Sequence, residues 1–170
     1  MMTRAFVIVY GILTLIILAM IPFFVVLLMR GAPFVPSKKT AVDAMIALSQ
    51  PIANQRSVDI GSGAGSIAIA FARAGAEAHG VELNPVLVWW SRWRIRVCGL
   101  QGKAFIHRGN LWTFDYSSFH IVTLYGFPSM MAPLAQKLNR ELPTGARVVS
   151  NTFRFPSWKL AQKVGDVYLY

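Results

Sequence analysis

The chain has 170 residues, with 17 Lys and Arg against 7 Asp and Glu, and 55% of its residues are hydrophobic. This length leaves room for one folded domain and excludes a second one with its own core. The single cysteine excludes a disulfide framework, and three histidines without ligand spacing give no reason to expect a metal site. The net charge of +10 favours an anionic partner surface.

The first predicted element is an apolar helix at the N-terminus. Residues 5–29 contain no charged side chain. At about 1.5 Å per residue, a helix of this length exceeds the roughly 30 Å of a bilayer core. The run is too long for a signal peptide, whose apolar region covers about 7–15 residues, and it ends without a small-residue cleavage site. The sequence therefore predicts a transmembrane anchor over residues 5–29, with the lipid bilayer as a partner.

The flanking charges predict how this anchor is oriented. Arg4 precedes the apolar run, whereas Arg30, Lys38 and Lys39 follow it. Cytoplasmic flanks carry the excess of Lys and Arg, so residues 30–39 are expected to be a cytoplasmic linker. The expected product is a single-pass membrane protein whose domain, residues 40–170, lies in the cytoplasm. With lipid headgroups available as the anionic partner, nucleic acid is not expected.

The remaining chain alternates between short apolar strands and helical spacing. This alternation predicts an α/β fold of the Rossmann-like type, with a mostly parallel, doubly wound sheet. A last antiparallel edge strand is predicted over 166–170, but the region after Phe153 is short for a final helix and two strands. We therefore expect a sheet trimmed at the C-terminus. The other predicted strands are 57–60, 76–83, 103–107, 120–125 and 147–153, and the predicted helices are 40–49, 67–74, 85–98 and 130–142.

The most informative feature is the glycine turn after the first strand. That strand ends near Asp59, and Gly61, Gly63 and Gly65 follow at alternate positions. A dinucleotide fingerprint has its third glycine at the sixth position of the motif, whereas here it falls at the fifth. Glu82 follows Gly61 by 21 residues and ends the next strand, where a carboxylate can reach both hydroxyls of a ribose. The pattern predicts a nucleoside-containing cofactor other than a dinucleotide.

Six segments together carry a family resemblance. They are FVPS (34–37), DIGSGAGS (59–66), GVELNPVLVWWSR (80–92), GNLW (109–112), YGFPSMM (125–131) and FRFPSW (153–158). They resemble the membrane-anchored class I, seven-strand, S-adenosylmethionine-dependent protein-lysine methyltransferases that act on the adenine nucleotide translocase and the ATP synthase c-subunit. The size and single apolar segment look like a bacterial relative, which implies the bacterial inner membrane.

The resemblance implies a cofactor site for S-adenosyl-L-methionine. Asp59 and the three glycines are expected at its methionine end, Glu82 at the ribose and Asn110 beside the adenine. The chain departs from the usual family pattern at Ala64, Ser66 and Asn110. The full set of implied cofactor residues is Asp59, Gly61, Ser62, Gly63, Gly65, Glu82, Asn84, Asn110 and Leu111.

The resemblance also implies methyl transfer to an amine, with a lysine on a membrane protein as the substrate. A lysine has a free pKa of about 10.4 and must lose its proton before it attacks. Tyr125, which follows the fourth strand, is a candidate for orienting the amine, although a core aromatic role is equally compatible with its position. Two alternatives stay open. One is a methyltransferase for lipid headgroups or small amines, and the other is a non-catalytic cofactor-binding or assembly protein of the membrane.

The predicted helix 85–98 is both aromatic and basic. Its tryptophans either pack on the sheet while the arginines face water, or part of this face lies on a membrane surface, where both residue types are favourable. The residues concerned are Trp89, Trp90, Trp93, Arg92, Arg94 and Arg96.

Overall fold

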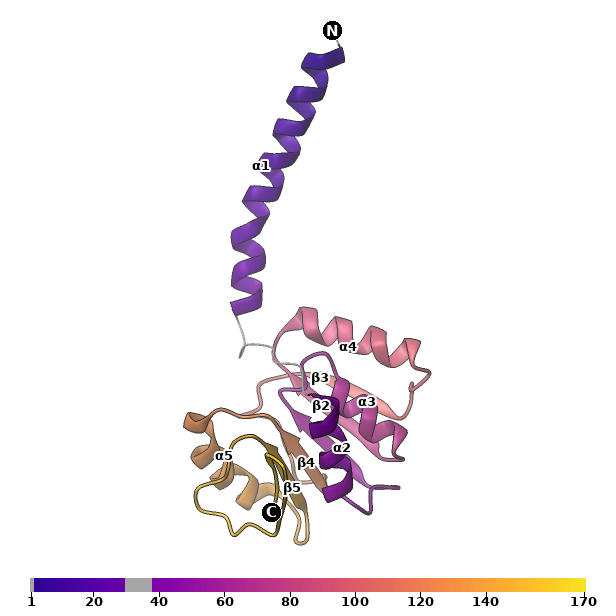
Figure 1. The fold of residues 1–170 in the computed structure, drawn as a ribbon, viewed down its shortest axis with the longest axis vertical. Coiled ribbons are helices and arrows are strands. Elements are labelled where there is room, and N and C mark those ends of the chain that lie inside the picture. The colour runs from indigo at the N-terminus through magenta and orange to yellow at the C-terminus, as the bar shows by residue number, and fades with distance from the viewer. Residues whose placement is uncertain (1, 30–37) are drawn as a thin grey trace. The chain divides into compact units, whose positions relative to one another are not determined.

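The computed structural model describes residues 2–29 and 38–170, with side-chain detail omitted for residues 2–5, 7–8 and 22–29. The chain divides into two compact units, residues 1–33 and 34–170 (Figure 1), and each is considered by itself. The predicted linker 30–39 lies almost entirely outside the described residues.

The first unit contains one helix, α1 (Met2–Met29). Among the residues that the structure describes, no helix is long and apolar enough to cross a membrane. The transmembrane anchor predicted over residues 5–29 is therefore not supported by the structure. The prediction rested on every residue of the uncharged run 5–29, whereas the structure describes side chains only for residues 6 and 9–21 of that run.

The second unit is built on a seven-stranded sheet in the order β3-β2-β1-β4-β5-β7-β6. The first five strands are parallel, and β7 joins β5 in the antiparallel direction. Because the strand order reverses between β1 and β4, the carboxyl ends of the central strands open at a topological switch point. The strands are β1 (Arg56–Ile60), β2 (Glu77–Glu82), β3 (Ala104–Arg108), β4 (Ile121–Leu124), β5 (Arg147–Asn151), β6 (Gln162–Val164) and β7 (Val167–Leu169).

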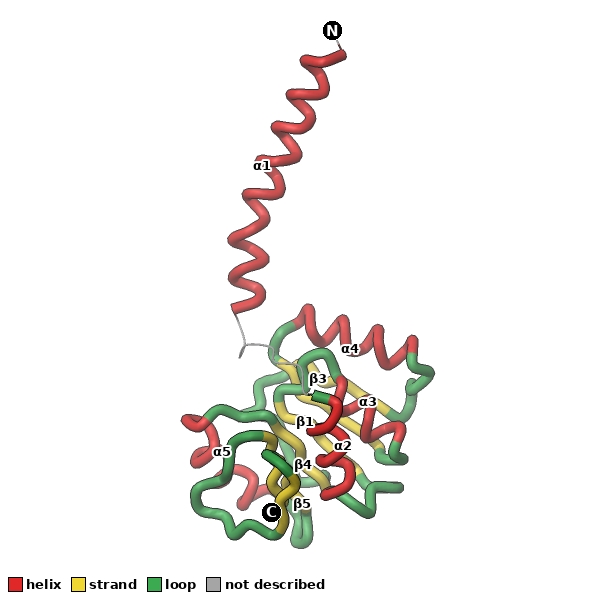
Figure 2. Tube along the Cα trace, in the orientation of Figure 1, coloured by secondary structure: helices red, strands yellow, loops and turns green. Residues whose placement is uncertain are grey.

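Helices cover both faces of this sheet (Figure 2). On one face, α2 (Lys39–Leu48), α3 (Ser66–Arg73) and α4 (Pro85–Val97) bury Met45, Phe71 and Ile95 in one apolar cluster. On the other face, α5 (Pro128–Glu141) buries Leu134 and Leu138 in a second cluster with strands β1 and β4. The parallel strands are apolar on both sides because each face is covered.

The predicted α/β sheet is confirmed, and the predicted strand and helix bounds after residue 38 lie within two residues of those observed. The expected trimming of the sheet is wrong, since β6 and β7 complete seven strands. They fit because each is only three residues long and a two-residue turn containing Gly165, at φ +57°, joins them. The segment 152–161 that leads to these strands contains no helix.

Candidate functional site

The glycine turn between β1 and α3 is bound tightly against β2. The backbone N–H groups of Gly61 and Ser62 both donate to the carbonyl of Val81, at 2.9 and 3.0 Å. Gly61, Gly63 and Gly65 have φ values of +73°, +53° and +74°, which glycine adopts without strain. A Cβ at Gly61 would meet no atom within 4 Å, so the exposed side of this backbone is open to a ligand.

Glu82 connects the glycine turn to the start of α4. Its side chain is buried, Oε2 accepts a 2.9 Å hydrogen bond from the Gly63 N–H, and Oε1 accepts a 2.8 Å bond from the Asn84 N–H. Each carboxylate oxygen can accept a further hydrogen bond. The acid therefore shapes the turn and keeps acceptor capacity for two hydroxyl donors.

Asp59 lies one strand away from Glu82, at the end of β1. It is buried and accepts a 2.9 Å hydrogen bond from the Thr123 hydroxyl on β4. Burial raises the pKa of Asp59 to about 7; the Thr123 bond opposes this rise and the negative charge of Glu82 adds to it. With a pKa of about 7, Asp59 is about half protonated at neutral pH.

Arg94 holds the glycine turn from the side of α4. Its Nη1 lies 2.6 Å from the Ala64 carbonyl and 3.0 Å from the Ser66 hydroxyl. These are two of the positions where the chain departs from the usual family pattern, so a guanidinium from α4 fixes the turn there. Sequence reasoning did not assign Arg94 this role, although it lies on the same face of the helix as the buried Ser91 and Ile95.

Close backbone packing also determines which residues can occupy this turn. A Cβ on Gly65 would come within 2.9 Å of the Ser91 Cβ, and one on Gly80 within 2.5 Å of the Ser62 Cβ. The Ser62 side chain points under the turn toward β2, and its buried hydroxyl has no hydrogen-bond partner in the described part of the chain. Ser62 can therefore contact a ligand through its backbone rather than its hydroxyl.

The other predicted site residues lie along the same edge of the sheet. The Gly109 N–H donates to the Glu82 carbonyl at 3.0 Å, which brings the segment after β3 beside the acid. There Asn110 is exposed, and its Oδ1 accepts a 3.0 Å bond from the Trp112 N–H. Leu111 is half-buried, and its carbonyl accepts a 3.0 Å bond from the Tyr116 hydroxyl.

Asn84 follows β2 and Tyr125 follows β4 on this edge of the sheet. Asn84 caps α4, because its Oδ1 accepts a 2.9 Å bond from the Val86 N–H. Tyr125 follows β4, is half-buried and meets Phe153 edge-on with ring centroids 5.9 Å apart. The structure thus gathers all the predicted residues at the carboxyl ends of β1–β4, and their individual roles stay predictions.

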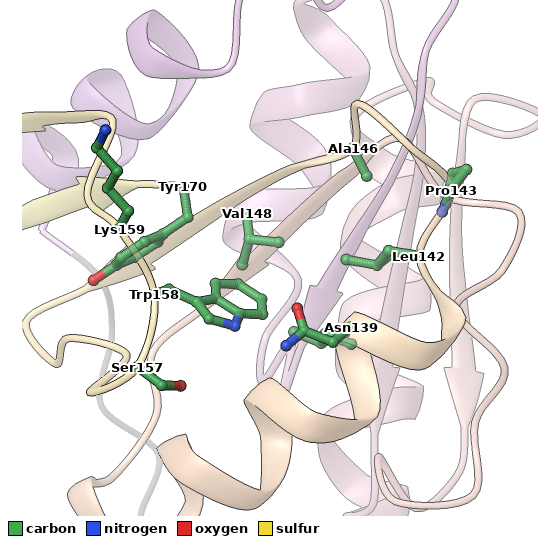
Figure 3. Close-up of a pocket in the computed structure, with 10 residues that line it drawn as sticks. Asn139, Leu142, Pro143, Ala146, Val148, Ser157, Trp158, Lys159 and Tyr170 are labelled. Carbon is green, nitrogen blue, oxygen red and sulfur yellow. The ribbon is translucent and has the colours of Figure 1, made fainter.

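A pocket of about 360 Å³ lies elsewhere in this unit (Figure 3). It is lined by Leu138 and Leu142 at the end of α5, by Ala146 just before β5, and by Trp158 and Tyr170. Because α5 runs back from the carboxyl end of β4, this pocket lies at the amino ends of the strands. It contains none of the predicted site residues and is not the candidate cofactor site.

The sheet order, the glycine turn and the acid at the end of β2 define the class: this is the class I methyltransferase fold. A solved RNA methyltransferase from Salinibacter ruber, in complex with S-adenosyl-L-homocysteine, is 32% identical, with a TM-score of 0.77 over 80% of this chain and 92% of that one. The family model described as the ANTKMT methyltransferase domain matches residues 59–162. The chain therefore belongs to the ANTKMT methyltransferase domain family.

Two relatives extend this comparison. The ATP synthase c-subunit lysine N-methyltransferase of Rattus norvegicus is 41% identical over 136 residues, which is 79% of this chain and 62% of that protein. A protein-lysine N-methyltransferase of Saccharolobus islandicus (strain REY15A) is 32% identical over 148 residues, 81% of this chain and 92% of that protein. The chain spans about three fifths of the length of the rat relative.

Proposed function

We propose that this protein transfers a methyl group from S-adenosyl-L-methionine to a lysine side chain of another protein. The observation that carries the proposal is the Glu82 carboxylate, held by the N–H groups of Gly63 and Asn84 at the mouth of the glycine turn. Membership of the ANTKMT methyltransferase domain family and the two lysine methyltransferases among its relatives support it.

The residues at the glycine turn fit this cofactor. The open backbone at Gly61 leaves room for its methionine part, and Glu82 has acceptor capacity for both ribose hydroxyls. We propose that Asn110, which is exposed after β3, contacts the adenine. When bound, the cofactor supplies an electrophilic methyl group on a sulfonium, and the chain's own residues bind and orient it.

Most of the catalytic effect then depends on positioning the amine. Methyl transfer needs a neutral nitrogen held in line with the methyl carbon, which lowers the barrier through proximity and orientation. Tyr125 follows the strand next to β1 and is the residue we propose for orienting this amine. The Phe153 ring lies against Tyr125, with ring centroids 5.9 Å apart, and this contact limits where the Tyr125 ring can lie.

The proposed substrate is a membrane protein with a lysine at the membrane surface. The rat relative is named for its action on the ATP synthase c-subunit. We propose the same class of target for this chain, and a location at the cytoplasmic face of the bacterial inner membrane. Only the uncharged residues 5–29 and the basic flank after them support this location. Extraction of native membranes at alkaline pH, with protease protection, tests the location.

Labelled S-adenosyl-L-methionine added to native membranes tests the activity. We expect the label to appear on a membrane protein, and mass spectrometry should locate it on a lysine. The Glu82→Gln variant should give no label. The matched control is Glu77→Gln, the same change at the exposed start of β2. Label on lipid would replace the lysine proposal with the headgroup alternative, and label on RNA would favour the activity for which the Salinibacter protein is named. Failure to bind the cofactor would favour the non-catalytic alternative.

A further inference from the structure

One side of α4 carries an apolar stripe with no partner in the described part of the chain. Leu83, just before the helix, is 52% exposed, and Val97, its last residue, is 66% exposed. The spacing of the stripe follows the helical repeat, so its side chains lie on one face. We call this the α4 stripe; its members are Leu83, Val86, Trp89, Trp90, Trp93 and Val97.

The α4 stripe is held rigidly. Val88, Ser91 and Ile95 bury the opposite face of the helix against the sheet. The Arg92 guanidinium donates to the Ile106 carbonyl at 3.0 and 2.7 Å, which ties the helix to β3. Within the stripe, the rings of Trp90 and Trp93 stack with centroids 4.7 Å apart. The exposed aromatic surface is therefore preformed and does not need ordering on contact.

The chain segment that carries the stripe has basic but no acidic side chains. Residues 83–114 contain five Lys and Arg and no Asp or Glu. Arg96 is exposed on α4 itself, and Lys103 and Arg108 are exposed at the two ends of β3. A partner that fits must have an apolar region deep enough to bury the side chains of the stripe, and negative charge beside that region.

We propose that the α4 stripe docks the methyltransferase unit on an anionic lipid surface. Tryptophan rings and arginines are both favourable at the level of the headgroups, and aliphatic side chains such as Val97 enter the acyl region. This inference goes beyond methyl transfer and does not depend on it. Because Leu83 directly follows Glu82, docking brings the cofactor edge of the sheet close to the bilayer.

Two other occupants fit the stripe less well. A second copy, packed stripe against stripe, would bring Arg92 and Arg96 of both copies together with no acid in residues 83–114 to pair with them. RNA matches the charge and can stack on tryptophans, but it offers nothing apolar for Leu83, Val86 and Val97. A bilayer containing anionic lipid satisfies the aromatic, aliphatic and basic side chains together.

Tryptophan fluorescence of the full chain tests this docking, even if another segment holds the protein on the membrane. The probe is a vesicle of phosphatidylcholine, with or without phosphatidylglycerol, carrying brominated acyl chains that quench nearby indoles. Trp112→Phe with Trp158→Phe leaves only the three stripe tryptophans as reporters. The expected result is strong quenching in anionic vesicles and weak quenching in neutral ones.

A matched pair of substitutions separates the stripe from general surface effects. Val97→Glu should raise the lipid concentration needed for half-maximal quenching roughly tenfold, from lost apolar contact and added repulsion. Val164→Glu, at an exposed valine on β6, should leave it unchanged. Equal effects of the two changes, absence of quenching in anionic vesicles, or a response to single-stranded RNA or to protein concentration in place of lipid would overturn the proposal.

Discussion

The substitution Glu82→Gln tests whether one carboxylate organises the cofactor turn. The carboxylate accepts backbone hydrogen bonds on both oxygens, from Gly63 at 2.9 Å and from Asn84 at 2.8 Å. A glutamine has one carbonyl oxygen and one NH₂ group, so it can keep only one of these acceptors. Whichever way the amide turns, one backbone N–H then faces another donor in a buried position.

The expected loss of stability follows from these two bonds. A hydrogen bond to a charged group contributes about 1.5–3 kcal/mol, and a buried donor without an acceptor costs about 1–3 kcal/mol. Removing the charge of Glu82 also relieves its repulsion of Asp59, which returns part of this cost. We expect Glu82→Gln to lower the free energy of unfolding by about 2–4 kcal/mol before any cofactor is added.

Urea unfolding followed by circular dichroism measures this change, and hydrogen exchange of the Gly63 amide reports on the turn directly. Glu77→Gln is the control, since Glu77 is half exposed on the same strand and its ion pair with Arg56 is worth at most about 1 kcal/mol. Calorimetry with S-adenosyl-L-methionine should also show affinity falling more than tenfold for Glu82→Gln. Equal stability of the two variants, with unchanged exchange at Gly63, would refute the role of Glu82 in shaping the turn.

Three further changes probe the surroundings of this acid. Asp59 stays protonated to about pH 7 in the folded protein but ionises near its ordinary value of 3.8 when unfolded, so its contribution to stability falls as pH rises between these values. Asp59→Asn should therefore become more stable than wild type as pH rises across that window, by about 4 kcal/mol above pH 7. Denaturant titrations at several pH values measure this, and a stability difference between the two proteins that does not change with pH would contradict it. In the same assay, Gly65→Ala should lower the free energy of unfolding by about 2–4 kcal/mol, because its Cβ would lie 2.9 Å from the Ser91 Cβ and φ is +74°. An unchanged free energy of unfolding would mean that α4 can move away from the new Cβ at little cost. Arg94→Gln should weaken cofactor binding about tenfold in calorimetry, whereas Arg96→Gln, which is exposed, should not; parallel losses would assign the effect to net charge.

Much of the cofactor edge follows from the sequence because parallel strands align their carboxyl ends. Asp59 and Glu82 each lie at the end of an apolar strand, and strands joined by a βαβ connection are usually neighbours. Their side-by-side placement was therefore predictable, as was the open glycine turn beside them. The helix and strand bounds were predictable for the same reason, since turn glycines and cap residues such as Asn84 mark them.

Contacts between distant segments were not predictable. Nothing near Arg94 in the sequence shows that its guanidinium reaches Ala64, thirty residues earlier. His79 and His107 show no ligand spacing, yet adjacent strands bring Nδ1 of the first to 2.8 Å from Nε2 of the second. Strand β6 was also missed, because a three-residue strand is too short for an alternating pattern to stand out.

Helix α4 belongs to two surfaces at once. Its inner side holds the cofactor turn through Arg94 and the close packing of Ser91 on Gly65, and its outer side is the α4 stripe. If lipid contact tilts the helix even slightly, the turn moves with it, and binding of the cofactor biases the same tilt. The two affinities are then thermodynamically linked, so any factor by which lipid strengthens cofactor binding is the factor by which cofactor strengthens lipid binding. The cofactor is then bound most tightly when the α4 stripe is in contact with lipid.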